Sequence, residues 1–420
     1  MELFLICGLA IATGIFAGLL PALPVFTGPL LLFMFAPSDL SLLHMLLFWL
    51  ISYSGTQFFG SIATITTRIP GEESAVIYLE DINKLNHDQK KKLLFDTACG
   101  SWFAASISII IVWAVVTFMN PSILPALLSN SVQLTVYLTA ICLLIFINSK
   151  PFYAFLLIML AALLAPKQNY ALPDMWYSIT ELFSGYTLYM VVLGTIIIPM
   201  LFDKNDDPKY PTGNEISKPR IPNILTVFKS TLIGIVAGLI PGPSASMATT
   251  FAYKTNRGSI FSKILSAETA NNASVVIVAI PFFILALPTN QNTLLMSNLM
   301  DLRSTLIVDQ IPYLINKLTI IFLMVMLLYF YLSTHLINWY ANTVRFLHDK
   351  MKFILGAILL GLISFDLSYS NITWDRYAIL LLFFALLGFL LRKYKISPVP
   401  FLFSIVLSDK LIWLIIQNLY

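Results

Sequence analysis

The chain has 420 residues, of which 58% are hydrophobic and only 11% are charged, and its formal net charge is +4. This composition excludes a soluble globular domain and places the chain among polytopic membrane proteins. Apolar runs close to the roughly 20 residues that cross a bilayer as a helix recur along the sequence. We therefore predict an all-α, multi-pass protein of the cell (inner or cytoplasmic) membrane.

The first apolar segment has an acidic residue and no basic n-region, which predicts a retained helix rather than a cleaved signal peptide. It is interrupted at GLLPALPVFTG, residues 18–28, where Pro21 and Pro24 lack a backbone N–H and stop a helix. Thr27 and Gly28 then begin the next limb, whose first N–H groups have no partner within the helix. We interpret this stretch as the tip of a hairpin that enters and leaves the membrane on one side.

The second apolar segment contains FFGSIATITTRIPGEE, residues 58–73, which is rich in small and hydroxylated side chains. Such residues suit close helix packing as well as a polar lining, and both interpretations stay open for Gly60 and Ser61. Glu72 and Glu73 precede a strongly polar loop, where we expect solvated carboxylates.

Two halves are indicated by motifs that recur across a polar linker. GLLP at 18–21 returns as GLIP at 238–241, an offset of 220 residues, and later apolar runs pair in the same way. The segment 203–222 has the composition of a linker. We therefore predict two transmembrane repeats, residues 1–202 and 223–420, each with one helical hairpin and about five transmembrane helices.

The distribution of basic residues predicts that these repeats have inverted topology. Loop 120–131 has no Lys or Arg, whereas the matching loop of the second half contains Arg345, Lys350 and Lys352. Extended along the chain, the rule places the linker inside and both termini outside. Of the 25 Lys and Arg residues, five then fall outside or within outer segments: Lys167, Arg303, Lys317, Arg376 and Lys410.

The second hairpin tip is GLIPGPSASMA, residues 238–248. Gly242 allows close approach of the backbone, and Ser244 and Ser246 supply hydroxyl groups at the start of a helix, which is a ready site for an anion. We expect a return limb of about eight residues, or roughly 12 Å, in either half, so that both tips end near mid-membrane.

A polar motif, AETANNAS at 267–274, lies in the early part of a membrane segment. Glu268, Asn271 and Asn272 have the spacing i, i+3 and i+4, which puts them on one helix face. Polar residues inside a membrane are costly and are functional candidates by default. Their oxygens suit Na⁺, and the carboxylate could equally carry a proton.

These motifs predict a secondary transporter in which an organic anion lies between the two tips. The predicted cation-coupling residues are Glu268, Asn271 and Asn272, with Na⁺ or H⁺ as the coupling ion and no other cofactor or metal. The predicted substrate-binding residues are Pro21, Thr27, Gly28, Gly60, Ser61, Pro241, Gly242, Ser244, Ser246, Asn271 and Asn272.

Two other functions are alternatives to transport. A membrane scaffold or assembly component of an envelope or export complex would keep the repeat as architecture alone. A membrane-embedded enzyme would need a constellation of His, Asp or Glu, and neither that nor a GxxxxGK[ST] motif appears in the sequence.

The motifs quoted above, with YSGTQFFGSIATITTRIPGEESAV and GFLLRKYKISPVPFLFSIVLSD, resemble successive blocks of the TctA family over roughly residues 8–410. TctA is the large membrane subunit of tripartite tricarboxylate transporters. The resemblance implies cation-driven carboxylate transport, a small four-helix membrane subunit and a periplasmic solute-binding protein. By this resemblance the family's motif positions are Gly18, Pro21, Gly28, Gly60, Ser61, Pro70, Gly71, Glu72, Gly238, Pro241, Gly242, Glu268, Asn271 and Asn272.

The chain departs from the family pattern at its tips and at the second IPG motif. Ala22, Pro24 and Pro243 stand where the family favours glycine, and Leu287-Pro288-Thr289 replaces its second IPG. The substrate and the need for a binding protein are therefore open.

Overall fold

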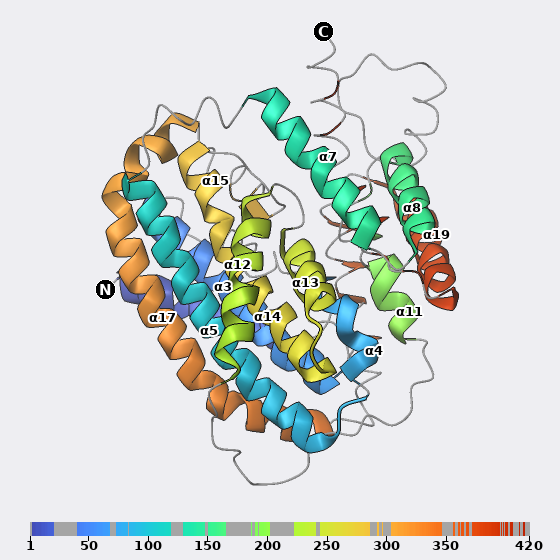
Figure 1. The fold of residues 1–420 in the computed structure, drawn as a ribbon, viewed down its shortest axis with the longest axis horizontal. Helices are drawn as coiled ribbons and strands as arrows, with labels where there is room; N and C mark the ends of the chain where they lie inside the picture. Colours follow the sequence, from blue (N-terminus) through green and yellow to red (C-terminus); the bar gives the residue numbers. More distant parts are fainter. Residues whose placement is uncertain are drawn as a thin grey trace. The chain divides into compact units, whose positions relative to one another are not determined.

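The regular elements of the described residues are helices, and they fall into two compact units (Figure 1). Unit 1 comprises residues 1–124 and 207–346, and unit 2 comprises residues 125–206 and 347–420. The computed structural model describes 2–20, 40–67, 73–82, 84–118, 129–147, 150–164, 193–201, 222–240, 244–285, 304–346 and 372–394, with isolated residues elsewhere.

Most of the described helices belong to unit 1. Its elements are α1 (Glu2–Leu19), α3 (Leu42–Thr67), the 3-10 helix η1 (Glu73–Tyr78), α4 (Leu79–Ile82), α5 (His87–Phe118), α12 (Ile224–Leu239), α13 (Ser244–Thr255), α14 (Ile260–Ile277), α15 (Ala279–Leu285) and α17 (Ser304–Phe346).

Unit 2 is built from α7 (Asn130–Ile147), α8 (Pro151–Leu164), the π-helical turn η3 (Leu193–Ile197), α11 (Ile198–Leu201) and α19 (Trp374–Lys393). α7 packs on α8, and α19 packs on η3 and α11. The ends of α19 suit its dipole, because Asp375 lies in the first turn and Arg392 and Lys393 lie in the last.

Six helical stretches in the described part of the chain are long and apolar enough to span a membrane, and α8 and α12 are shorter apolar helices. This agrees with the predicted all-α, multi-pass class. Large apolar side chains are exposed on the outer helices, as at Phe4, Tyr313 and Met324, which are 85%, 83% and 68% exposed. A surface of this kind is suited to lipid rather than to water.

The centre of unit 1 is formed by α3 and α14. α3 is buried from Leu46 to Thr67, and α14 is buried from Ile264 to Ile277. α1, α5 and α17 pack around α3, while α5, α12 and α13 pack around α14. Both central helices are therefore enclosed by other helices, and both contain the polar residues that a lipid-facing helix would avoid.

The second hairpin is formed by α12 and α13. Asn223 caps α12, because its Oδ1 accepts hydrogen bonds from the amides of Leu225 and Thr226. The return limb α13 has 12 residues, or about 18 Å, so it is longer than the expected eight. The helix includes the polar residues Lys254 and Thr255 at its end. Its length is still well below the roughly 30 Å thickness of the hydrocarbon core.

Close packing in unit 1 depends on glycine where α1 crosses α3. A Cβ atom added at Gly18 would lie 2.7 Å from Cβ of Phe59 and 2.8 Å from the carbonyl oxygen of Thr56. Real Cβ atoms do not approach other atoms so closely, so only glycine lets the two helices meet at this point.

The crossing of α12 and α14 repeats this arrangement. A Cβ atom added at Gly238 would lie 2.8 Å from Cβ of Ile277 and 2.8 Å from the carbonyl oxygen of Ser274. Gly238 follows Gly18 by 220 residues, and its two neighbours follow those of Gly18 by 218. At both crossings, a Cβ atom and a backbone carbonyl oxygen at matching positions therefore limit the distance between the helices.

We expect Gly238→Ala and Gly18→Ala to destabilise the protein by about 1–3 kcal/mol, because the added methyl group overpacks each crossing. Gly8→Ala is the matched control on α1, since nothing lies within 4 Å of the added Cβ there. The free energy of unfolding in detergent micelles checks this. Equal changes in all three variants would show that the crossings are not limited by glycine.

Candidate functional site

The predicted polar face of α14 lies at the centre of unit 1. Glu268 and Asn271 are fully buried, and Asn272 is 1% exposed. Each side chain has a hydrogen-bond partner on a different element: η1, α3 and α5. The structure thus joins three elements of the first half of the sequence to one helix of the second.

Asn271 joins α14 to α3. Its Nδ2 donates a hydrogen bond of 2.8 Å to Oε1 of Gln57, which is 1% exposed. A buried amide without a partner is strongly unfavourable in a medium without water. The Gln57–Asn271 pair therefore favours one register of the α3–α14 contact.

Asn272 joins α14 to α5. Its Nδ2 donates to Oγ of Ser101 at 2.9 Å and to the carbonyl oxygen of Glu268, in its own helix, at 3.0 Å. These two bonds use both hydrogens of the amide group. The orientation of the Asn272 side chain is therefore fixed by its neighbours.

Glu268 contacts the segment that follows α3. The hydroxyl of Tyr78 donates a hydrogen bond to Oε1 of Glu268, whereas Oε2 has no hydrogen-bond partner among the described residues. A carboxylate in this position needs a proton or a cation to balance its charge, because burial of an uncompensated charge is very costly. The acceptor oxygen Oε2 is available for either.

A second tyrosine–carboxylate pair fastens the same segment, Glu73–Ile82, to the second hairpin. The hydroxyl of Tyr253 in α13 donates to Oδ2 of Asp81 in α4, and Lys84 forms an ion pair with Oδ1. Burial opposes ionisation of Asp81, but the hydrogen bonds from Lys84 and Tyr253 outweigh it and lower the pKa of this carboxyl group. Asp81 is therefore a stable acceptor for Tyr253 at neutral pH.

The serines of the second tip begin α13. Ser244 is 1% exposed, and its Oγ has no hydrogen-bond partner among the described residues. Ser246 is also buried. A free hydroxyl at a helix N-terminus can bind an anion together with the first amides of the helix.

Gly60 and Ser61 lie in the buried part of α3. A Cβ atom added at Gly18 would be 3.1 Å from the amide nitrogen of Gly60, so Gly60 lies near the α1–α3 crossing. The hydroxyl of Ser61 donates to the carbonyl oxygen of Phe58 in its own helix. A role in lining a site stays a prediction for both residues.

Other predicted positions lie outside the described residues: Pro21, Thr27, Gly28, Pro70, Gly71, Glu72, Pro241 and Gly242. In contrast, three residues that we did not predict take part in the polar cluster: Gln57, Tyr78 and Ser101. Gln57 could have been found from the sequence, because it is an amide side chain in an apolar segment. Nothing in the composition of its loop distinguishes Tyr78 from the other loop residues.

The polar cluster is defined here as Gln57, Tyr78, Ser101, Glu268, Asn271 and Asn272. It can hold one small cation or proton at a carboxyl group that is enclosed by helices. Within the described residues, no group of three or more His, Cys, Asp or Glu side chains is arranged to hold a metal ion.

Comparison with protein families gave a match over residues 4–403 to the family described as Tripartite tricarboxylate transporter TctA family. Comparison with curated proteins and with solved structures gave no match.

We expect Asn271→Leu and Gln57→Leu each to lower the free energy of unfolding by about 1–3 kcal/mol, because each removes the buried hydrogen bond between the two amides. The double variant should lose less than the sum of the two. Ser274→Ala is the control, since that hydroxyl donates to a carbonyl of its own helix. The free energy of unfolding of the four variants is measured in mixed micelles. Strictly additive losses in the double variant would contradict the pairing of the two amides.

Proposed function

Because the chain belongs to the tripartite tricarboxylate transporter TctA family, we propose that it is a secondary transporter that moves a di- or tricarboxylate on a Na⁺ or H⁺ gradient. Family membership makes the chain a membrane transport component and not an enzyme. It also implies a carboxylate substrate and a tripartite system, with a periplasmic binding protein and a small membrane subunit.

The observation that carries the proposal is the unpartnered oxygen of Glu268 inside the polar cluster. Oε2 of Glu268 is fully buried and has no hydrogen-bond partner among the described residues. A carboxyl group that must bind a proton or a cation to remain buried is suited to couple ion movement to a conformational change. Asn271 and Asn272 belong to the same coupling site.

The carboxylate substrate is proposed to lie between the two hairpin tips. Support comes from Ser244, whose free hydroxyl stands at the N-terminus of α13. In this proposal the substrate also contacts Ser246, Gly60, Ser61, Asn271 and Asn272, together with the tip residues Pro21, Thr27, Gly28, Pro241 and Gly242. The helix N-termini at the tips would stabilise the anion without a lysine or arginine.

Two inverted repeats, 1–202 and 223–420 around the cytoplasmic linker 203–222, are part of the proposal. The matching glycine contacts at the α1–α3 and α12–α14 crossings support them. So does the composition of the units, since each unit takes one segment from either half of the sequence. Termini on the outer side follow from the distribution of Lys and Arg.

Coupling follows from charge balance at a buried site. An anionic substrate and the carboxylate of Glu268 would repel each other in a medium of low polarity. Neutralisation of Glu268 by a cation or proton therefore favours binding of the substrate, and binding of the substrate favours that neutralisation. A cation taken from the side where it is concentrated therefore favours substrate binding from that side.

Uptake of a radiolabelled tricarboxylate into proteoliposomes, with the binding protein and the small subunit present, tests the proposal. An inward Na⁺ or H⁺ gradient should drive accumulation. Glu268→Gln should reduce this accumulation about 5- to 150-fold, as expected for a coupling free energy of about 1–3 kcal/mol, while exchange of substrate without a gradient continues.

Asp375→Asn is the control, because this carboxyl group is exposed on α19. Accumulation that does not depend on either gradient in the wild-type protein would rule out coupled transport. Unchanged gradient-driven accumulation in Glu268→Gln would remove the polar cluster from the coupling mechanism.

A further inference from the structure

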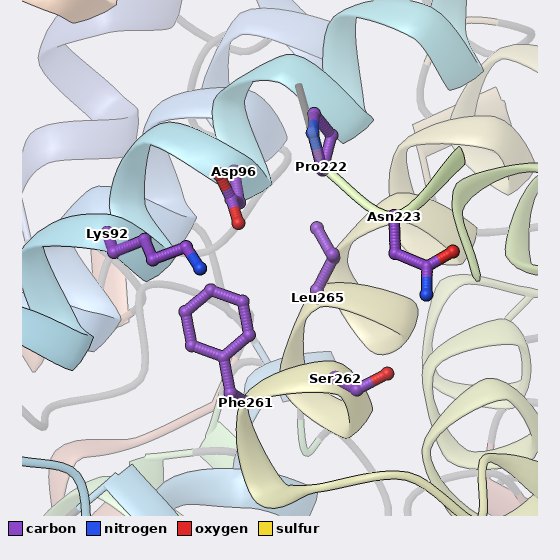
Figure 2. A pocket seen from close by; sticks show the side chains of 7 residues that line it. All are labelled: Lys92, Asp96, Pro222, Asn223, Phe261, Ser262 and Leu265. Atoms are coloured by element: carbon purple, nitrogen blue, oxygen red, sulfur yellow. The ribbon is translucent and has the colours of Figure 1, made fainter. Parts of the chain in front are cut away.

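A cavity of about 370 Å³ lies in unit 1 between the N-terminal parts of α5, α12 and α14, and no residue of the polar cluster lines it (Figure 2). Its lining combines apolar and polar side chains: Lys92, Asp96, Pro222, Asn223, Phe261, Ser262 and Leu265. We call it the headgroup cavity. Nothing in the proposed transport mechanism uses it.

The headgroup cavity contains charges of both signs. Lys92 and Asp96 come from successive turns of α5, and both side chains point into the cavity (Figure 2). Nζ of Lys92 lies 5.2 Å from the ring centroid of Phe261, a distance at which a cation and an aromatic ring attract each other. The carboxyl group of Asp96 is 3% exposed, so it lies deeper than the exposed Lys92.

Polar groups at two helix N-termini complete the lining. Asn223 is the cap of α12 and uses its Oδ1 in capping. Ser262 lies in the first turn of α14, where its Oγ accepts a hydrogen bond of 3.1 Å from Nδ2 of Asn256. The hydrogen of that hydroxyl therefore remains able to donate to a ligand.

The headgroup cavity lies where two membrane-spanning stretches begin, at Gln89 and Ile260. Directly after Asn223, the side chains of Ile224 and Leu225 are 66% and 61% exposed. Further exposed apolar side chains continue along α12: Phe228, Leu232, Val236 and Leu239. An exposed apolar helix face that begins at a polar cavity has the form of a site for a lipid, with acyl chains along the helix and a headgroup in the cavity.

We propose that the headgroup cavity binds a phospholipid with a zwitterionic primary-amine headgroup, of the phosphatidylethanolamine type. The phosphate contacts Lys92 and Ser262, near the N-terminal end of α12, where a cation and the helix dipole favour an anion. The ammonium group contacts the deeper carboxylate of Asp96. A purely anionic headgroup would meet Asp96 unfavourably, and a purely cationic one would meet Lys92 unfavourably.

Native mass spectrometry of the full-length protein with lipids that share acyl chains tests this assignment. We expect the wild-type protein to retain phosphatidylethanolamine roughly tenfold better than phosphatidylcholine or phosphatidylglycerol, the effect of one charge-assisted hydrogen bond. Phosphatidylcholine cannot donate a hydrogen bond to Asp96, and phosphatidylglycerol has no cation. Equal retention of the three lipids would overturn the proposal.

Two variants assign the contacts. Asp96→Asn should abolish the preference for phosphatidylethanolamine, while the protein still retains the other two lipids. General destabilisation would not change the ratio of phosphatidylethanolamine to the other two lipids. Lys92→Gln should weaken retention of all three lipids, whereas Lys229→Gln, an exposed lysine of α12 outside the cavity, should not. An unchanged preference in Asp96→Asn would overturn the proposal.

A final arm distinguishes a lipid from a soluble ligand of the same chemistry. Soluble phosphoethanolamine, titrated in the absence of phospholipid, should bind at least about a hundredfold more weakly than phosphatidylethanolamine, because it lacks the acyl chains that cover α12. Equally tight binding of phosphoethanolamine would show that the occupant is not a lipid. None of these measurements depends on transport.

Discussion

The hydrocarbon core contains no water to complete a hydrogen bond, and this constraint decides how unit 1 is arranged. Polar side chains such as Gln57, Glu268 and Asn271 can lie there only if protein surrounds them and supplies their partners. α3 and α14 contain these residues and are accordingly the two helices that others enclose. Glycines at the crossings with α1 and α12 let the enclosing helices approach closely enough to exclude lipid.

The enclosure of α14 also limits access to its polar residues. The three polar residues of α14 are at most 1% exposed, so an ion could reach Glu268 only after a neighbouring element moved. The segment Glu73–Ile82 is a natural candidate, because hydrogen bonds from Tyr78 and to Asp81 attach it to α14 and α13. In this structure the helices around α14 therefore shield its three polar residues from solvent.

Composition and motifs were sufficient to predict the helical membrane class, the TctA family and the polar face of α14. Those features depend on local properties: hydropathy, and a spacing of three and four residues on one helix. The partners of that face could not be predicted in the same way. Gln57 and Ser101 are 214 and 171 residues from their partners, and no local pattern reports a contact over such a distance. α13 is longer than its apolar part predicts, because the helix continues through the polar residues near its end.

That sequence separation has a consequence for biosynthesis. Gln57 and Ser101 are inserted into the membrane with the first half of the chain, before Asn271 and Asn272 have been translated. At about 5–20 residues per second, Gln57 waits roughly 10–40 s for its amide partner. During this interval the side chain of Gln57 needs a hydrogen-bond partner other than Asn271. The polar contact between α3 and α14 can therefore be completed only after residue 271 has been translated.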